Sequence, residues 1–482
     1  MGALDVSPED ITRGPIPRTL VVLALPLLAQ NLVHVLNQLV DTFWLGRVGE
    51  VEVAAIGLNF PLMAVMFSVT AAATVGTQIL VAQRVGADQE RAARRLTVNG
   101  LLLAFGLGIV LLGIVLLAGE WVVGALGAGP EVGPLAVAYL VIFAAFFPFG
   151  TAGDALERGF VGWGDTRAAL YINVVAVGTN IVLDPFLILG IGPFPRLEVQ
   201  GAALATGIGY LLGFAAALAL ATGLRSSLQL TMADLAPSLA DQRALLDTGS
   251  PVSGQFLAAQ TARVAIIGVV ATVGGAAGLA AYTVGARIAT VAFVPATGFG
   301  NAAQSMVGQN LGADRPDRAH GTIRTGVAIA GGTLFVVGAI QWLVPGLLAE
   351  VFVPTLTETG FALTVDYLEI LAYSYWAMGV SAVLLAAFNG AARTRTGLVI
   401  DVLKYWGIRI PAAAAALPAA YVVIWGVPLG GLDLGVHAVF WAVTVSNVLT
   451  AVGVGAYYYR RHERMFHNAA TEASEASEAV AD

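Results

Sequence analysis

Residues 83–88 read Gln-Arg-Val-Gly-Ala-Asp, and residues 309–314 read Gln-Asn-Leu-Gly-Ala-Asp. Two further sets of residues recur at nearly the same offset: Pro26 and Gln30 with Pro251 and Gln255, and Phe160, Gly162, Thr166 and Arg167 with Phe388, Gly390, Thr394 and Arg395. Chance does not arrange three pairings at nearly the same offset, so the chain is an internal repeat of two related halves.

Each half contains six runs of about 20 or more apolar residues, which is long enough for a helix to cross a hydrocarbon layer of about 30 Å. In the first half the runs are Leu20–Leu45, Val53–Val81, Val98–Ala118, Leu135–Phe160, Ala168–Leu189 and Val199–Ala221. In the second half they are Leu246–Val270, Leu279–Val307, Val327–Leu348, Leu363–Phe388, Leu398–Trp425 and Leu434–Tyr457. We therefore predict an all-α integral membrane protein of twelve transmembrane helices. Two pseudo-symmetric six-helix bundles then face each other across a V-shaped central cleft.

The composition supports a membrane protein and excludes several kinds of chemistry. Of the 482 residues, 57% are hydrophobic and only 11% are charged, unlike a soluble domain. The chain has no cysteine, which excludes disulfides, thiolate metal sites and cysteine nucleophiles. There is no phosphate-cradling Gly-x-x-x-x-Gly-Lys sequence, so any transport must be driven by an ion gradient. We expect no cofactor, no nucleic-acid partner and a monomer in the lipid bilayer.

Arginine placement predicts the orientation, because cytoplasmic loops near helix ends hold an excess of basic residues. The even-numbered connections and the flanks of the chain are basic: Arg84, Arg91, Arg94, Arg95, Arg158, Arg167, Arg225, Arg243, Arg315, Arg318, Arg324, Arg393, Arg395, Lys404, and at the ends Arg13, Arg18, Arg460, Arg461 and Arg464. The odd-numbered connections hold Arg47, Arg196 and little else. We expect a multi-pass protein of the plasma membrane with both termini in the cytoplasm.

The polar stretches divide the chain into five parts. We expect a cytoplasmic N-terminal segment (1–16), an N-terminal six-helix bundle (17–223), a cytoplasmic linker (224–244) and a C-terminal six-helix bundle (245–460). The remaining residues, 461–482, are expected to form a disordered cytoplasmic tail, because the stretch from Ala469 to Asp482 is small and acidic.

The first predicted helix has a polar stripe. Gln30, His34, Asn37 and Asp41 fall on one face at helical spacing, within an otherwise apolar run. A carboxylate at membrane depth is costly, so it normally faces a cavity or a partner and marks an ion or substrate path. The alternative is that Asp41 lies near the outer interface and is merely solvated.

The fifth predicted helix repeats the theme with Asn180 and Asp184, one turn apart. Both acids are about one turn from the outer ends of helices that run outward, so they share a level in the membrane. Tyr139 and Thr206 lie at similar distances from the outer ends of their own helices. We expect these polar groups to converge within the first half.

Two carboxylates in one low-dielectric pocket cannot both ionise cheaply, so such a pair can take up and release a proton. Alternatively, it can bind a monovalent cation such as Na⁺, with Asp41, Asp184 and Asn180 as ligands and other oxygens completing the shell. A purely structural interpretation remains, in which the pair is a permanent hydrogen-bonded lock between two helices.

Further polar residues are candidates for a relay or the cavity. Asp154 is a candidate relay on the fourth helix, and we expect Glu157 at the interface, paired with Arg158. Gln255, which matches Gln30, is a cavity candidate, whereas Ile266 stands where the repeat would place a second Asp41. Ion coupling therefore belongs to the first half, unless acids near helix ends take part: Asp366, Glu369 or Asp401.

Pro26 lies inside the first helix, where its missing amide hydrogen removes a backbone hydrogen bond. Protonation next to a proline-weakened helix offers a way to bend it. Pro26 is therefore a candidate hinge, although prolines in membrane helices are often only structural.

With these residues in hand, the chain resembles the multidrug and toxic compound extrusion (MATE) family of secondary antiporters. The motifs that carry the resemblance are Pro26 with Val40-Asp41-Thr42, Gly76-Thr77-Gln78, Gln83 to Asp88, Gly164-Asp165-Thr166, Asn180 with Leu183-Asp184-Pro185, and Gly201 to Thr206. The resemblance implies two six-helix bundles and efflux of cationic, amphipathic organic compounds in exchange for H⁺ or Na⁺. It also implies that Asp41, Asn180, Asp184 and Thr206 form the cation site.

One departure from the family and two competing functions remain open. Some prokaryotic relatives carry an acid in helix seven for sodium, and that acid has no clear counterpart here, since Gln255 and Gln260 stand where it would be sought. Na⁺ coupling through the second half is therefore in doubt. A lipid-linked oligosaccharide flippase of similar architecture would need a basic cavity. The residues available for one are few: Arg263, Arg287 and Arg409. A membrane-embedded enzyme would need a catalytic constellation, and we find none in the sequence.

Overall fold

The computed structural model describes residues 7–126, 129–352, 357–418, 423–424, 427–428 and 431–481, and most of them are helical. The first half contains α1 (Pro8–Arg13), α2 (Ile16–Leu45), α3 (Glu50–Gly86), α4 (Glu90–Ala125), α5 (Val132–Trp163), α6 (Thr166–Leu189), α7 (Glu198–Ala219), the π-helix η1 (Leu220–Leu224) and the 3₁₀ helix η2 (Met232–Asp234). The second half contains α8 (Leu239–Gly312), α9 (Pro316–Leu343), α10 (Pro345–Phe352), α11 (Glu358–Ala372), α12 (Tyr375–Gly390), α13 (Thr394–Val402), the π-helix η3 (Leu403–Arg409), α14 (Ile410–Ala414), the strands β1 (Val423–Ile424) and β2 (Val427–Pro428), and α15 (Val436–Ala481).

Twelve spans account for these helices. Within the described residues, nine helices are long and apolar enough to cross a membrane, and α11 with α12 forms a further span bent by 49°. A straight helix of the 74 residues of α8 would be about 110 Å long, far more than a bilayer needs. Gly275, with φ +55° and ψ −152°, breaks α8 into two spans. The consecutive pieces α13, η3 and α14 supply the twelfth.

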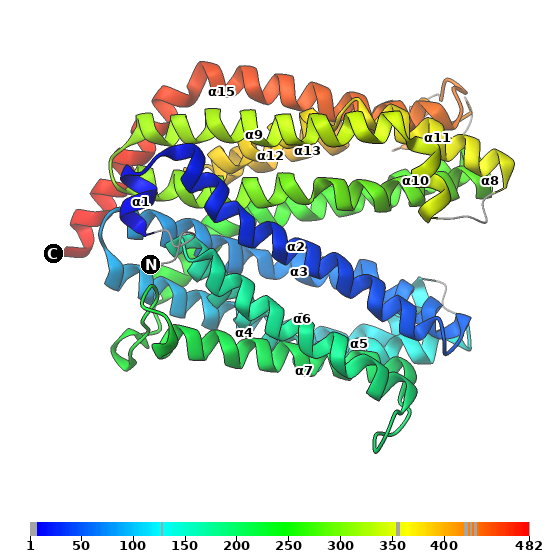
Figure 1. The fold of residues 1–482 in the computed structure, drawn as a ribbon, viewed down its shortest axis with the longest axis horizontal. Helices are drawn as coiled ribbons and strands as arrows, with labels where there is room; N and C mark the ends of the chain where they lie inside the picture. The colour runs from blue at the N-terminus through cyan, green and yellow to red at the C-terminus, as the bar shows by residue number, and fades with distance from the viewer. Residues whose placement is uncertain are drawn as a thin grey trace.

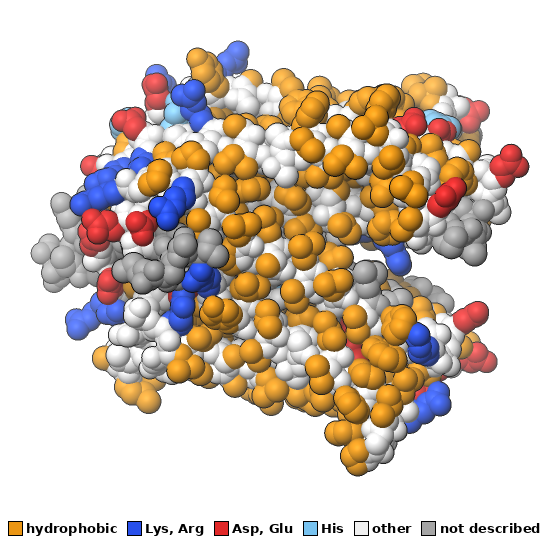
Figure 2. Space-filling model, viewed as in Figure 1, with side chains coloured by type: hydrophobic (Ala, Val, Ile, Leu, Met, Phe, Trp, Pro, Cys, Tyr) orange, Lys and Arg blue, Asp and Glu red, His pale blue; other side chains and the backbone are white. Residues whose placement is uncertain are grey.

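The spans form two bundles that meet at one end and separate at the other. Figure 1 shows α2 to α7 in one bundle and α8 to α15 in the other, with both termini at the same end, which we call the terminal end. At the opposite, open end a hollow separates the two halves (Figure 2). Apolar side chains cover the middle of this face and charged ones gather at its two ends, as a bilayer requires (Figure 2). The chain is therefore a multi-pass membrane protein.

The repeated hexapeptides close the terminal end. Gln83 Nε2 donates a hydrogen bond to the Gly390 carbonyl at 3.1 Å, and Gln309 Nε2 donates one to the Gly162 carbonyl at 2.8 Å. Each glutamine thus crosses to a glycine of the other half, and the two bonds are related by the internal repeat. Close approach of α3 and α8 needs small residues at the contact.

The connection between the halves is tied to the first bundle. The Arg225 guanidinium contacts both carboxylate oxygens of Asp165, at 2.6 and 2.8 Å, and Ser227 donates to the same carboxylate at 2.6 Å. Farther on, Arg95 pairs with Asp241 at 2.7 Å. α8 begins at Leu239, so the second bundle starts six residues before the predicted position 245.

The N-terminal segment is folded and lies under both halves. A capping box between Ser7 and Asp10 starts α1, and Ile11 is fully buried. Arg315 donates to the Thr12 carbonyl at 2.9 Å, and Arg318 donates to the Ile11 carbonyl at 3.1 Å. The segment 1–16 is therefore packed against the second half over its described residues.

Two expectations differ from the structure. The apolar run Leu398–Trp425 is helical only to Ala414, because hydropathy does not distinguish a helix from the short antiparallel pair β1 and β2; residues 419–422 and 425 lie outside the described part. The tail expected to be disordered continues α15 to Ala481. Its first part is held by packing, since Phe466, Ala469 and Ala470 are buried against the second bundle.

Candidate functional site

The two acids of the polar stripes meet inside the first bundle. The side chains of Asp41 on α2 and Asp184 on α6 lie close enough to share a hydrogen bond when one carboxyl is protonated, and Asp184 is fully buried. Asn180, one turn before Asp184, donates to its Oδ1 at 3.2 Å and also contacts Thr206 Oγ1 on α7 at 3.2 Å. Tyr139 on α5 lies within interaction distance of Thr206. Four helices thus converge on one polar pocket.

Several oxygens in this pocket lack a donor. Among the described residues no N–H or hydroxyl group donates to Asp41 Oδ1, Asp184 Oδ2, Asn180 Oδ1 or Asn37 Oδ1, all of which are buried. Buried acceptors without donors are costly, and a small cation or a proton would satisfy them. The pocket therefore has spare acceptor capacity where positive charge is needed.

The rest of the α2 stripe lies against neighbouring helices. Gln30 Nε2 donates to Glu157 Oε1 of α5 at 2.6 Å. His34 Nε2 lies 2.7 Å from Asn173 Nδ2 of α6. From the terminal end to the open end, the stripe thus forms a row of polar contacts that ends at Asp41.

A second polar cluster sits nearer the terminal end. Asp154 lies within electrostatic reach of Glu157 and Arg158. Arg158 Nη1 donates to Gln78 Oε1 at 3.0 Å, and Gln78 Nε2 donates to Ser305 Oγ of the other half at 3.1 Å. The first bundle is thus linked to α8 through Gln78.

The expectation that Glu157 is interfacial is wrong. Glu157 is only 7% exposed, and its hydrogen-bond partner is Gln30 rather than Arg158. Spacing from the helix end suggested a headgroup position, but α2 covers this face of α5. Sequence reasoning also gave no role to Asn173, although its position two helical turns before Asn180 is a readable signal.

Gln255 does not join the cavity. It is buried within the second half, where its Nε2 contacts Asn389 Oδ1 at 3.5 Å and the Thr394 carbonyl at 3.3 Å. The repeat preserved the residue but not its surroundings, because Gln30 faces an acid and Gln255 faces an amide and a carbonyl. Ile266, at the position matching Asp41, is in the apolar core.

The remaining acids of the second half make other contacts. Asp366 pairs with His437 at 3.0 Å, and both side chains are about half exposed. Asp401 is buried and within electrostatic reach of Lys404 and Arg409. Pro26 sits inside a continuous α2, and its role as a hinge stays a prediction.

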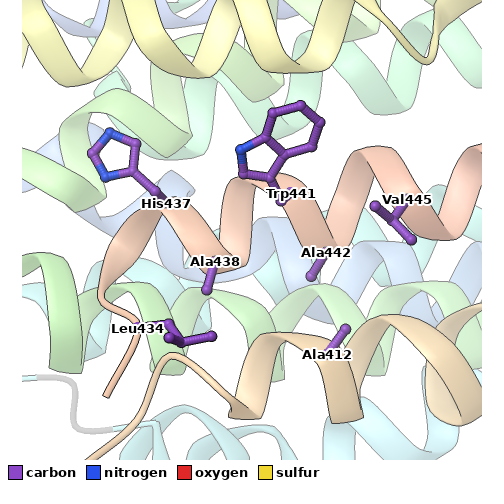
Figure 3. Close-up of a pocket in the computed structure, with 7 residues that line it drawn as sticks. All are labelled: Ala412, Leu434, His437, Ala438, Trp441, Ala442 and Val445. Carbon is purple, nitrogen blue, oxygen red and sulfur yellow. The ribbon is translucent and has the colours of Figure 1, made fainter. Parts of the chain in front are cut away.

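A groove on the second half lies away from the acid pair. Its lining comes from α14, from α15 and from the loop just before α15: Ala412, Leu434, His437, Ala438, Trp441, Ala442 and Val445. Figure 3 shows His437 and Trp441 on the same side of α15. This lining is mainly apolar and has no acidic member, so it does not offer a second cation site.

The described residues also hold no group of three His, Asp or Glu side chains that could bind a metal ion. A resident transition metal has no ligand set there. A monovalent ion in the acid pocket would instead rely on carboxylate, amide and hydroxyl oxygens.

The Gln30–Glu157 contact leads to a stability prediction. Glu157→Leu is expected to lower the free energy of unfolding by about 1–3 kcal/mol, because Gln30 Nε2 would lose its buried acceptor. Glu157→Gln keeps an acceptor oxygen of the same size and should remain near the parent. Thermal unfolding of the detergent-solubilised variants, followed by size-exclusion chromatography, measures the difference. Equal losses for both variants would assign the effect to charge rather than to the hydrogen bond.

Two joined six-helix bundles, one of which holds an acid pair at membrane depth, define a class: this is a membrane transporter. The MatE family model matches residues 26–186 and 251–414, once in each half. The chain therefore belongs to the MatE family of multidrug and toxic compound extrusion transporters.

Individual relatives are similar along nearly the whole chain. The FAD transporter of Shewanella oneidensis is 27% identical over 93% of this chain and 95% of its own. A probable multidrug resistance protein NorM of Thermotoga maritima is 26% identical over 83% of this chain and 85% of its own. A solved outward-facing multidrug resistance MATE transporter superposes with a TM-score of 0.86, covering 95% of this chain and 99% of the other at 24% identity.

Proposed function

We propose that this transporter is an antiporter that exports cationic, amphipathic organic compounds in exchange for H⁺ or Na⁺. Asp41 and Asp184, with Asn180 and Thr206, load the coupling ion. The observation that carries the proposal is the buried acid pair, whose neighbouring oxygens lack donors. A proton or a monovalent cation supplies the positive charge that this pocket is built to accept.

The proposal places the protein in the plasma membrane as a monomer, with its terminal end in the cytoplasm. Basic loops at the terminal end support this orientation. The hollow at the open end would then face outward, and protons or sodium ions would reach the acid pair from the outside (Figure 2).

α2 is suited to couple ion loading to the cleft because its two parts pack against different bundles. Leu20, Leu23 and Leu27 belong to a core shared with α8, α9 and α12 of the second half. Asp41, at the other end of the helix, contacts Asp184 within the first half. Pro26 lies near the change from one environment to the other, where the backbone lacks a hydrogen bond.

The coupling step follows from this arrangement. When the acid pair is ionised, its charge favours an open pocket that admits water and an organic cation. Loading a proton or Na⁺ removes the repulsion between the carboxylates, so α2 can close on α6 and narrow the cleft. Substrate binding and ion loading then exclude each other, as antiport requires.

Transport in vesicles tests the proposal. Purified protein is reconstituted in liposomes, and efflux of a fluorescent organic cation such as ethidium is followed under a proton gradient and, separately, under a sodium gradient. We expect one of the two gradients to drive export, and we expect this export to stop when the matching ionophore dissipates that gradient. If export is the same with a proton gradient, with a sodium gradient and with no gradient, the antiport mechanism is wrong. If the protein instead transports only lipid-linked sugar in an ion-driven way, a flippase is favoured.

A further inference from the structure

The two halves differ in the charge that they carry at membrane depth. The first half contains the buried acids, whereas the second half has Arg263, Arg287 and Arg409 within its spans. Arginine inside a bilayer is costly unless it faces water, a partner or a ligand. The proposed mechanism uses none of these three residues.

Arg263 and Arg287 lie at the same depth. Arg263 is 12 residues before Gly275, where α8 reverses, and Arg287 is 12 residues after it. At 1.5 Å per residue, both lie about 18 Å from the turn at the open end, near the middle of the bilayer. Both side chains are exposed, and neither makes a hydrogen bond or ion pair with another residue in the described part of the chain. They are two free guanidinium groups at one level.

Arg263 belongs to the face of α8 that looks toward the first half. Residues 249, 256 and 263 recur at seven-residue spacing and therefore share a helix face. At the terminal end of this face, a Cβ on Gly249 would collide with the Ala72 carbonyl of α3. Nearby, Ser253 Oγ donates to the Val69 carbonyl at 3.4 Å. The same face continues toward the open end as Arg263, where the halves have separated.

Arg287 belongs to the corresponding face of the second span of α8, which contains residues 287, 294, 301 and 308. At its terminal end, a Cβ on Gly308 would meet Ala82 of α3, and the Asn301 carbonyl accepts a hydrogen bond from Gln78 at 3.3 Å. Both arginines therefore continue, toward the open end, rows of residues that contact the first half at the terminal end. Figure 2 shows basic side-chain atoms at the hollow, beside the second half.

An aromatic and polar wall lies behind Arg263. The rings of Tyr282 and Tyr367 stack with centroids 5.6 Å apart, and Arg263 and Arg409 are both within electrostatic reach of these two tyrosines. Arg409 is held in place, since it donates to Ser446 at 2.8 Å and to Asn447 at 2.6 Å. Asp401 balances part of its charge. The uncompensated positive charge therefore resides on Arg263 and Arg287.

We propose that Arg263 and Arg287 form an anion-binding subsite on the cleft wall of the second half, which holds a carboxylate or phosphate group of the transported molecule. The subsite rests on the proposed function and specifies its substrate class: amphipathic compounds that carry an anionic group in addition to their cationic one. Guanidinium groups bind such groups through paired hydrogen bonds, and water exclusion in the cleft strengthens them.

A matched pair of dyes tests the subsite without any ion gradient. Rhodamine B has a free carboxylate, and its ethyl ester has the same cationic ring system without that charge. Binding of each dye to purified protein in a non-ionic, lipid-free detergent is measured by fluorescence anisotropy. We expect the parent to bind rhodamine B about tenfold more tightly than the ester, which corresponds to one good charged contact.

Variants of the arginines provide the decisive comparison. Arg263→Gln with Arg287→Gln should remove the tenfold preference while leaving the affinity for the ester unchanged. Arg263→Lys with Arg287→Lys should retain part of it. The matched control is Arg243→Gln, an arginine 86% exposed at the terminal end, which should behave as the parent. A preference that survives the double glutamine change, or an equal loss for both dyes, would overturn the proposal.

A lipid arm separates the transported molecule from an anionic headgroup. Suppose that phosphatidylglycerol binds the parent in an arginine-dependent way, and that the parent without this lipid binds rhodamine B no more tightly than the ester. The site then belongs to lipid and the proposal is wrong. These binding results do not depend on Asp41. A failed gradient experiment with an intact dye preference would count against antiport and not against the subsite.

Discussion

Asp41→Asn is expected to abolish gradient-driven export of an organic cation while leaving the fold intact. Asparagine has nearly the same shape as aspartate, but it can neither take up a proton nor contribute negative charge to a cation site. The shared hydrogen bond with Asp184 would become an ordinary amide contact, and Asp184 alone would lack the second carboxylate that the coupling ion needs. Dye efflux from reconstituted vesicles should fall to the level of protein-free vesicles, with an unchanged elution profile of the purified variant.

The control for this change lies in the other half. Asp401 is also a buried acid, and Asp401→Asn is the same exchange of carboxylate for amide. Transport by this variant should stay near that of the parent, because Asp401 is far along the chain from the acid pair and contacts Lys404 and Arg409 electrostatically. Retained coupling in Asp41→Asn, or its loss only in Asp401→Asn, would place the ion path in the second bundle.

Gly86→Val and Gly312→Val are expected to prevent closure of the terminal end. A Cβ on Gly86 would collide with the Gln309 carbonyl, and a Cβ on Gly312 would collide with the Gln83 carbonyl. Backbone on the opposite side cannot move away as a flexible side chain could, so each change should destabilise the closed contact by at least about 1–3 kcal/mol. The hydrogen bonds from Gln83 and Gln309 would be lost with it.

The absence of cysteine in this chain makes the effect measurable. Ser305→Cys introduces one thiol at a position only 1% exposed, between the halves. The thiol should resist a maleimide reagent in the parent background and react in the two valine variants. Gly106→Val is the matched control, since a Cβ there meets no other atom within 4 Å. Equal labelling in all four backgrounds would show that the glycines do not hold this end closed.

The two predictions probe opposite ends of one coupling scheme. The acid pair lies toward the open end of the first half, and the paired glutamines lie at the terminal end between the halves. α2 packs against both bundles. A change at the acid pair that alters thiol reactivity at position 305 would therefore demonstrate communication between them, in the sense of a shared two-state element.

Much of the fold could be read from the sequence because lipid imposes simple rules. Every spanning segment must be helical and apolar over about 20 residues, so hydropathy locates spans without knowledge of their neighbours. The repeat of Gln83–Asp88 at 309–314 predicted two like halves, and helical spacing predicted that Asp41 and Asp184 share a face and a depth with their partners. The run ending at Trp425 was less well predicted, because hydropathy alone does not exclude a hairpin.

Pairing across helices was decided by tertiary structure. The same repeat position gives Gln30 an acid partner and Gln255 an amide and a carbonyl, because different residues surround it in each bundle. Spacing along α5 gave Glu157 a depth but could not show that α2 covers it. The cleft position of Arg263 and Arg287 likewise depends on how α8 packs on α3. Periodicity along one helix determines which residues share a face, whereas the packing of several helices determines what that face meets.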